Sequence, residues 1–255
     1  AGHTCAVRSS GLSRTVRCWG GNDAGQLGSG TTTDSSVPVT VPGLTSTFVG
    51  AAAVAAGSLS TCALLDDGTA RCWGRNAEGQ LGDGSLVGSL SPVDVSGLSG
   101  ATSLDVGLFN ACATLSDGAV RCWGSNQTGQ LGNGTTSPSP IPVAVSVIDD
   151  AIDVAVGSLF ACSTATTTQV RCWGHNDFGR LGNESLLDRL QLIMKDLGVG
   201  DGRTEAAYAE GGVGLLAVGE KRERLVGAGV KRAYHHATTT ERGEHRTVGD
   251  DLLRD

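Results

Sequence analysis

Residues 62–85 read CALLDDGTARCWGRNAEGQLGDGS, and the same arrangement of cysteine, tryptophan, asparagine and glycine occurs four times in the chain. The tetrapeptide Arg-Cys-Trp-Gly begins at Arg17, Arg71, Arg121 and Arg171, so successive copies lie 54, 50 and 50 residues apart. Gly-Gln-Leu-Gly follows in the first three copies, and Gly-Arg-Leu-Gly follows in the fourth. Self-similarity at this period predicts a repeat architecture in which each copy packs against its neighbours.

Each copy has the pattern of several short β-strands. Between Cys62 and Cys72, the turn residues Asp66-Asp67-Gly68 are flanked by β-formers and small residues, which predicts a hairpin with the cysteines opposite each other. Further strands are predicted in residues 102–106 and 152–156 and in the Pro-Val-x-Val segments that begin at Pro38, Pro92 and Pro142. Together with 39 glycines and 4% aromatic residues, this pattern predicts an all-β fold of propeller blades.

The repeated residues resemble the regulator of chromosome condensation repeat family, in its secreted bacterial form, over residues 1 to about 185. The resemblance implies a β-propeller with seven blades when complete. Four repeats are expected, at residues 1–56, 57–106, 107–156 and 157–185. Because the first lacks an opening strand and the last lacks a Pro-Val-x-Val strand, three arrangements stay open: a fragment of a longer ring, an open arc, or a ring completed by another chain or by the tail.

The eight cysteines fall into four pairs. These pairs are Cys5 with Cys18, Cys62 with Cys72, Cys112 with Cys122, and Cys162 with Cys172. Opposed residues on antiparallel strands are close enough for a disulfide, so we expect one cross-strand disulfide in each repeat. Buried free thiols are an alternative, and zinc ligands are a weaker one, because structural zinc usually pairs cysteines that are closer in sequence. Disulfides would place the protein in an oxidising compartment: secreted, periplasmic or on the cell surface.

One tryptophan and one arginine occupy the same position in every copy. We expect the tryptophans to pack neighbouring blades against each other rather than to stack on a ligand. They are Trp19, Trp73, Trp123 and Trp173. The arginines of Arg-Cys-Trp-Gly are also expected to be structural, bonding loop carbonyls, with a ring of arginines that holds an anion as the alternative.

Charge and hydropathy restrict the partners that the chain could have. The formal net charge of −7 argues against a nucleic-acid surface, which needs clustered Lys and Arg. Because no segment has the roughly 18 consecutive apolar residues of a membrane helix, we expect no membrane span. Open blade edges could lead to self-association.

No nucleophile with a base, no paired carboxylates and no metal-ligand cluster interrupts the repeat pattern, so we expect no catalysis, cofactor or metal. The glycosylation sequons at Asn126, Asn133 and Asn183 carry little weight, because the repeat itself places the first two asparagines.

We expect a protein-binding rim, because loops on a rigid frame usually carry binding residues. The variable candidates are residues 8–14, 31–36, 85–91 and 135–140, with Phe109 and Phe160. The alternatives are an inhibitor of an enzyme and a carbohydrate-binding or cell-wall-binding module. The resemblance implies two more specific options. Secreted bacterial relatives include an inhibitor of β-lactamases, which is an example of the inhibitor alternative. The family's namesake is a nuclear nucleotide-exchange factor for a small GTPase, and an exchange factor is the less favoured option.

The composition changes after about residue 185. Every Lys and both Tyr lie in residues 186–255, which hold no Cys or Trp. Ser185 before the apolar run 186–197 predicts a capped short helix, followed by a flexible segment. His235, His236 and His245 are expected to be solvated rather than to bind a metal. The abrupt change suggests a hypothesis that the tail arises from a shifted reading frame.

Overall fold

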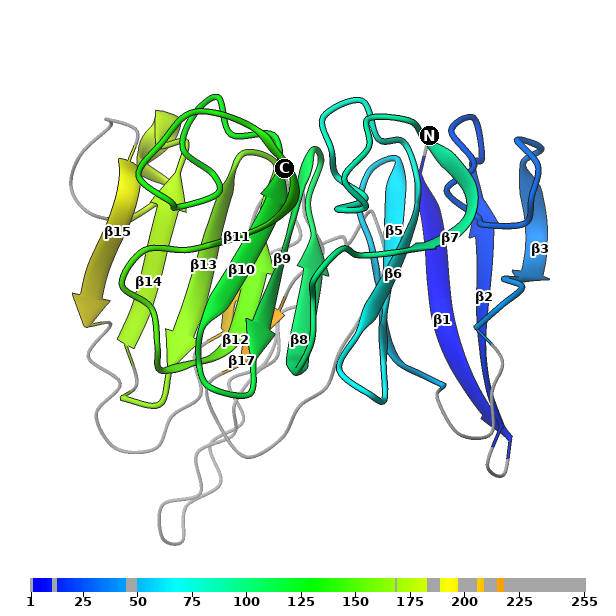
Figure 1. Cartoon of the computed structure of the whole chain (residues 1–255), viewed down its shortest axis with the longest axis horizontal. Coiled ribbons are helices and arrows are strands. Elements are labelled where there is room, and N and C mark those ends of the chain that lie inside the picture. Colours follow the sequence, from blue (N-terminus) through cyan, green and yellow to red (C-terminus); the bar gives the residue numbers. More distant parts are fainter. Residues whose placement is uncertain are drawn as a thin grey trace, which may run out of the picture.

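The computed structural model describes residues 2–10, 13–44, 50–167, 169–182, 189–196, 206–208 and 215–217. These residues form four antiparallel sheets that lie side by side in chain order, each one blade of a β-propeller (Figure 1). The first sheet contains β1 (His3–Ser10), β2 (Ser13–Gly20) and β3 (Ser35–Thr40). The second contains β4 (Ala51–Ala56), β5 (Ser60–Leu65), β6 (Ala70–Gly74) and β7 (Ser89–Asp94). The third contains β8 (Ala101–Val106), β9 (Asn110–Leu115), β10 (Val120–Gly124) and β11 (Ser139–Ala144).

The fourth sheet contains β12 (Ala151–Val156), β13 (Phe160–Ala165), β14 (Gln169–Gly174) and β15 (Arg189–Asp196). A short 3-10 turn, Asp177–Gly179, follows β14. A separate hairpin pairs β16 (Ala206–Tyr208) with β17 (Leu215–Ala217), and β17 approaches β12. No helix among the residues that the structure describes is long and apolar enough to cross a membrane.

The strands of each blade differ in burial because of their place in the array. The first strands β4, β8 and β12 contact one another in turn and so lie on the inner side of the array. The second strand of each four-stranded sheet is almost wholly buried, whereas β3, β7 and β11 are outer edge strands with mostly exposed or half-exposed residues. Prolines lie in these outer strands, where a missing N–H costs no ladder bond.

The sheets are offset from the sequence repeats. The strand that precedes Gly57 pairs with the hairpin that follows it, with Ala55 opposite Cys62. Residues 51–56, which end the first repeat in sequence, therefore belong to the second sheet. For the same reason the first sheet has three strands and lacks an inner strand, as its sequence predicts.

The prediction of a helix over residues 186–197 is wrong for residues 189–196, the part of this segment that the structure describes. Residues Arg189–Asp196 form β15, which pairs with β14 and places Ile193 opposite Cys172 and Arg189 opposite Gly174. The third sheet has the equivalent pairs, with Val143 opposite Cys122 and Ser139 opposite Gly124. The unpaired edge of β14 offers backbone hydrogen bonds that outweigh a local helical preference. The fourth sheet thus gains an outer strand without the Pro-Val-x-Val sequence, while Ser185 and the three tail histidines lie outside the described residues.

Val147 has an unfavourable backbone conformation. Its φ of 61° lies in the left-handed region, and its side chain is 89% exposed. The second repeat has Gly97 at this place in the turn after the outer strand, with a φ of 67°. A β-branched residue is strained in this region because its Cβ approaches the following carbonyl, whereas glycine is not.

We predict that Val147→Gly raises the free energy of unfolding by about 1 kcal/mol, because it relieves this strain without removing a buried contact. Urea unfolding at constant m-value measures the change. Val87→Gly is the matched control, because Val87 is also an exposed loop valine but has no positive φ. Equal or lower stability of Val147→Gly relative to Val87→Gly would contradict the prediction.

Candidate functional site

The junctions between blades are built from one tryptophan and the loop of the preceding blade. The indole Nε1 of Trp73 donates a hydrogen bond of 2.9 Å to the backbone carbonyl of Gln26. Trp123 bonds Gln80 and Trp173 bonds Gln130 in the same way, each at 3.0 Å. All three indoles are 0% exposed. Their position joins neighbouring blades and leaves no indole surface for a ligand at these junctions.

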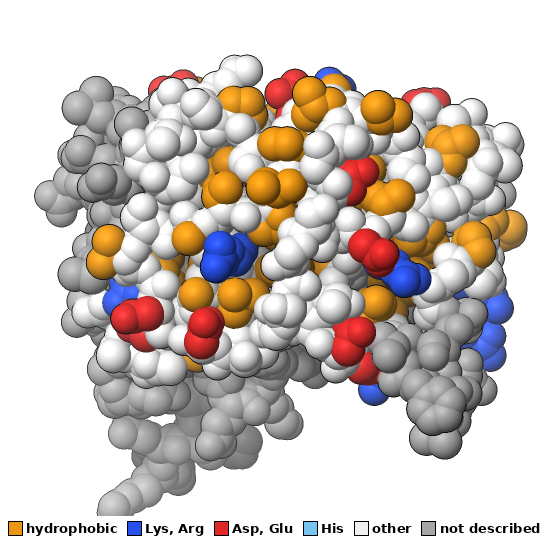
Figure 2. Space-filling view, in the orientation of Figure 1, with side chains coloured by type: hydrophobic (Ala, Val, Ile, Leu, Met, Phe, Trp, Pro, Cys, Tyr) orange, Lys and Arg blue, Asp and Glu red, His pale blue; other side chains and the backbone are white. Residues whose placement is uncertain are grey.

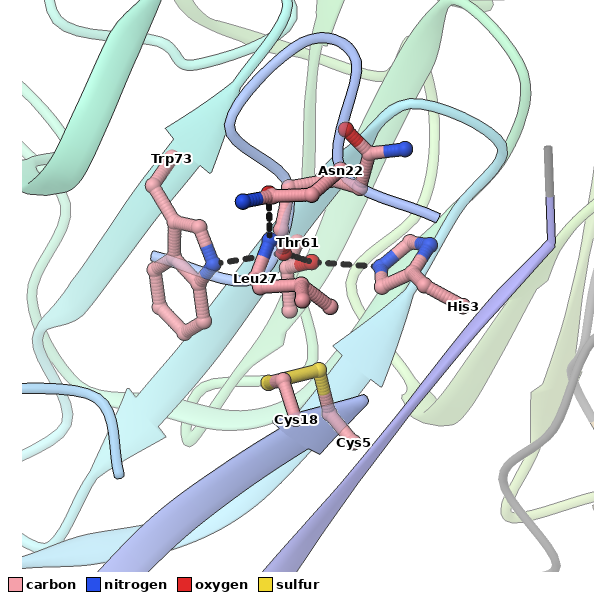
Figure 3. Close-up of a disulfide and its surroundings, with 8 residues drawn as sticks. His3, Cys5, Cys18, Asn22, Leu27, Thr61 and Trp73 are labelled. Carbon is pink, nitrogen blue, oxygen red and sulfur yellow. Dashed lines mark hydrogen bonds between the residues drawn. A yellow bond between two sulfur atoms is a disulfide. The ribbon is translucent and has the colours of Figure 1, made fainter. Parts of the chain in front are cut away.

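An asparagine holds each loop in the shape that receives the indole. Asn22 Oδ1 accepts a hydrogen bond of 2.9 Å from the Leu27 N–H (Figure 3). Its Nδ2 donates to the carbonyls of Thr31 and Thr33. Asn76 and Asn126 make the equivalent bonds. Asn126 is 0% exposed, so its sequon cannot accept a glycan in the folded protein.

The last glycine of Gly-Gln-Leu-Gly makes room for the indole. A Cβ on Gly28 would lie 2.8 Å from Nε1 of Trp73, and a Cβ on Gly82 would lie 2.8 Å from Nε1 of Trp123. Contacts this close would displace the ring. The recurring asparagine and the last glycine of Gly-Gln-Leu-Gly therefore shape the loop that receives the tryptophan. The sequence analysis did not assign them this role, although their recurrence in every repeat could have indicated it.

His3 adds a buried hydrogen-bond chain to the first junction. The Thr61 hydroxyl donates to the Gln26 carbonyl at 2.8 Å, so His3 Nε2, which is 2.7 Å from Thr61 Oγ1, must be the donor to that oxygen (Figure 3). Nδ1 is buried without a hydrogen-bond partner. Burial lowers the pKa of His3 from 6.5 to about 4, because a charged ring would lose its hydration.

The cysteines form the disulfides that their spacing predicts. Cys5–Cys18, Cys62–Cys72, Cys112–Cys122 and Cys162–Cys172 are all bonded, with Cα atoms 4.0 to 4.1 Å apart. No cysteine is free, which excludes the free-thiol and zinc interpretations in this structure. Each bond closes the central hairpin of one blade.

The arginines do not converge on a channel. Arg71 lies on β6, where its Nε donates to Asp94 at 2.7 Å and its NH1 donates to the Gly43 carbonyl at 2.9 Å. Arg171 pairs with Asp150. Because β6 and β14 are third strands and the inner strands are β4, β8 and β12, these two arginines do not form an anion-binding ring.

The variable loops place exposed apolar side chains on one edge of the blades. Leu86 and Val87 are 60% and 74% exposed in the loop that Asn76 holds, and Ile141 lies on the neighbouring outer strand. A Cβ on Gly84 would lie 3.7 Å from Ile141, so this loop and that strand are adjacent. We call Leu86, Val87 and Ile141 the loop patch. Figure 2 shows hydrophobic side chains spread over one face of the molecule, with acidic and basic side chains among them.

The two phenylalanines expected on the rim are placed differently from each other. Phe160 is buried in the fourth sheet, because it takes the position at the start of the hairpin that Asn110 has in the third. Phe109 is half-buried, and the guanidinium of Arg75 lies 5.6 Å from the centre of its ring. Among the described residues, no group of His, Cys, Asp and Glu could hold a metal ion.

Family models match this repeated architecture. The model described as "Regulator of chromosome condensation (RCC1) repeat" matches residues 15–64, 67–108 and 117–163, and a second model of the same repeat matches residues 51–80 and 101–130. The chain belongs to the RCC1 repeat family. The matched RCC1 repeats contain the junction tryptophans Trp73 and Trp123, whereas Trp173 lies after the last matched residue.

One curated protein is similar to this chain in sequence, and two solved structures are similar to it in fold, each over part of its length. The chain is 35% identical over 95 residues to the ultraviolet-B receptor UVR8 of Arabidopsis thaliana, covering 37% of this chain and 21% of the receptor. Human WBSCR16 aligns with a TM-score of 0.69 at 20% identity, over 83% of this chain and 54% of that one. A chain from the structure of Kap60 bound to yeast RCC1 (Prp20) aligns with a TM-score of 0.66 at 21% identity, over 85% and 52%. The chain therefore spans about half of these solved chains.

We predict that His3 makes the stability fall in mild acid. The folded-state pKa is about 4 and the unfolded value is 6.5, so a proton binds the unfolded chain preferentially between these values. The contribution of His3 to the free energy of unfolding should decrease by about 1.4 kcal/mol for each unit that the pH falls between 6.5 and about 4. Above pH 6.5 this contribution should stay constant.

The variant His3→Asn tests this prediction, because the third repeat has Asn110 at the equivalent position. Other titrating groups are common to both proteins, so the difference in urea unfolding free energy between the variant and the natural chain isolates His3. The difference should change with pH between 6.5 and about 4. A difference that is constant over this range would show that His3 does not have the lowered pKa.

Proposed function

We propose that the chain is a non-catalytic extracellular scaffold that binds another protein through the loop patch. The observation that carries this proposal is the exposure of Leu86 and Val87 on a loop with a fixed conformation. The Asn76 side chain donates to the carbonyls of Ser85 and Val87 at 3.0 and 3.2 Å, which fixes the segment that carries both apolar residues. Apolar side chains on a preordered loop lose little conformational entropy on binding, which favours recognition.

The proposed compartment is supported by the disulfides. Four bonds, one in every blade, would be reduced by the thiol systems of a cytosol and persist in an oxidising environment. A secreted, periplasmic or surface location suits such a scaffold.

A protein partner is also in keeping with the family. In one similar solved structure, yeast RCC1 (Prp20) has Kap60 bound to it. A glycan-binding module, by contrast, commonly uses exposed aromatic rings, and Trp73, Trp123 and Trp173 are buried at junctions. Inhibition of an extracellular enzyme would be one form of the proposed protein binding.

The double variant Leu86→Asp, Val87→Asp tests this proposal in an affinity capture from the extracellular proteins of the source organism. We expect a captured protein to bind the variant at least about tenfold more weakly, because two apolar contacts are lost and charges are introduced. Binding isotherms with the captured protein give the ratio. Non-reducing peptide maps confirm that the disulfides of both chains are intact.

Val147→Asp is the matched control, because it also places a carboxylate on an exposed valine, in the loop at the opposite end of the blade. Loss of binding in the double variant with full binding in this control supports the loop patch. Equal binding by all three chains, or a captured ligand that survives protease digestion, would contradict the proposal.

A further inference from the structure

The third blade has an asparagine followed by a glycine in the loop that leads to its outer strand. Asn133 and Gly134 come directly after the last glycine of Gly-Gln-Leu-Gly, and the second blade has Asp83 and Gly84 at the same place. Glycine has no side chain to obstruct its backbone nitrogen, so this nitrogen can approach the side-chain amide carbon of a preceding asparagine. The pair Asn133-Gly134 is therefore a place where the chain can react with itself.

Three hydrogen-bond donors converge on the side-chain carbonyl oxygen of Asn133. The Thr135 hydroxyl donates to Oδ1 at 2.9 Å, the Thr135 N–H donates to it at 3.1 Å, and Nδ2 of the buried Asn126 donates to it at 3.2 Å. A nucleophile that attacks Cγ of Asn133 would leave negative charge on this oxygen. Donors that already point at the atom where charge develops lower the free energy of the transition state. The loop thus activates the Asn133 amide toward nucleophilic attack.

The backbone nitrogen of Gly134 is the nucleophile within reach, and it is held less firmly than its counterparts in the first two blades. The Gly84 N–H donates to the Pro140 carbonyl on β11 at 2.9 Å, and the Gly30 N–H donates to the Leu90 carbonyl on β7 at 3.0 Å. Within the described part of the chain, the Gly134 N–H makes no such bond. A bonded N–H must leave its acceptor before its nitrogen can move to a side chain. Of these three loops, the one in the third blade combines an asparagine with a glycine nitrogen that is not held.

We propose that Asn133 converts itself to an aspartyl residue through a cyclic imide. The Gly134 nitrogen forms a bond to Cγ of Asn133 and loses its proton, while the side-chain nitrogen takes up a proton and leaves as ammonia. Water then opens the imide. Cleavage of the bond between Cγ and the Gly134 nitrogen gives an aspartate side chain, and cleavage at the main-chain carbonyl gives an isoaspartate linkage. The net reaction consumes water and releases ammonia, without any oxidant or reductant.

Asp83 shows how the aspartate product fits the loop. Its Oδ1 accepts hydrogen bonds from the Ser85 N–H at 2.9 Å and from Asn76 Nδ2 at 3.1 Å, and its Oδ2 accepts one from the Ser85 hydroxyl at 3.0 Å. Asn133 accepts the equivalent three bonds with one oxygen. The loop can therefore keep its shape after the reaction while it gains a negative charge, in the position that Asp83 has beside the loop patch. The proposal does not depend on the loop patch as a binding site and fails or holds separately from it.

Peptide mapping of the folded chain during prolonged incubation at neutral pH tests the proposal, because conversion of an amide to an acid changes the peptide mass. Asp83→Asn is the matched variant: it places an asparagine before Gly84, which has a φ of 88° against 80° for Gly134 but an N–H that is bonded to Pro140. We expect Asn133 to convert at least about tenfold faster than the asparagine introduced in the second blade, since breaking the Gly84 bond adds to the barrier. In the reduced chain in urea the two sites should convert at similar rates, because neither loop is folded.

A second pair of variants tests the role of the donors. Thr135→Val removes the hydroxyl that bonds Asn133 Oδ1 and should slow the conversion by about threefold or more, with solvent replacing part of the lost interaction. Thr136→Val is the matched control and should leave the rate unchanged, because Thr136 is an equally exposed neighbour and its hydroxyl makes no hydrogen bond to Asn133 among the described residues. Non-reducing peptide maps and circular dichroism confirm that each variant is folded.

Three results would overturn the proposal. The first is equal conversion at the two sites in the folded chain, which would show a property of the dipeptide and not of the loop. The second is an Asn133 that converts in urea but not in the folded chain. The third is a rate that Thr135→Val does not lower.

Discussion

The hydrogen bond from a tryptophan indole to the backbone carbonyl of a glutamine in the preceding blade recurs at all three junctions. The other recurring residues follow from it. The carbonyl must point at the next blade, so an asparagine fixes the loop; the ring needs space, so glycine follows leucine. Each indole also fills an apolar cluster shared by two sheets, and truncating such a buried ring typically costs about 3–5 kcal/mol.

Disulfides stabilise the hairpin within a blade, and tryptophans stabilise the contact between blades. Each disulfide links the two strands of one hairpin within a blade, so it restrains that hairpin whatever the neighbouring blades do. Each tryptophan links one blade to another. The side chains of Leu86, Val87 and Ile141 are exposed and take no part in either, which leaves them available on a rigid frame.

The all-β repeat fold and the cysteine pairing could be predicted because both are local and recur with nearly identical spacing. The helix expected after residue 185 was wrong because β15 is determined by the free edge of β14, which no local pattern encodes. Phe160 was expected on the rim, but its position in the hairpin places it in the buried core of the fourth sheet. The buried state of His3 depends on Thr61, 58 residues away, and the strain at Val147 depends on the turn that glycine makes in another repeat. The loop patch needed exposure values that sequence cannot supply.

The most direct test of the junction is a comparison of Gly82→Ala with Gly97→Ala by urea unfolding. The two glycines have φ values of 69° and 67°, so the backbone cost of alanine is the same, and a Cβ on Gly97 would meet nothing within 4 Å. Only the first change drives a methyl group into an indole, that of Trp123. The account predicts that Gly82→Ala is more destabilising by at least about 1–3 kcal/mol. Equal losses of stability would contradict it, because the tryptophan would then contribute nothing to the joining of the blades.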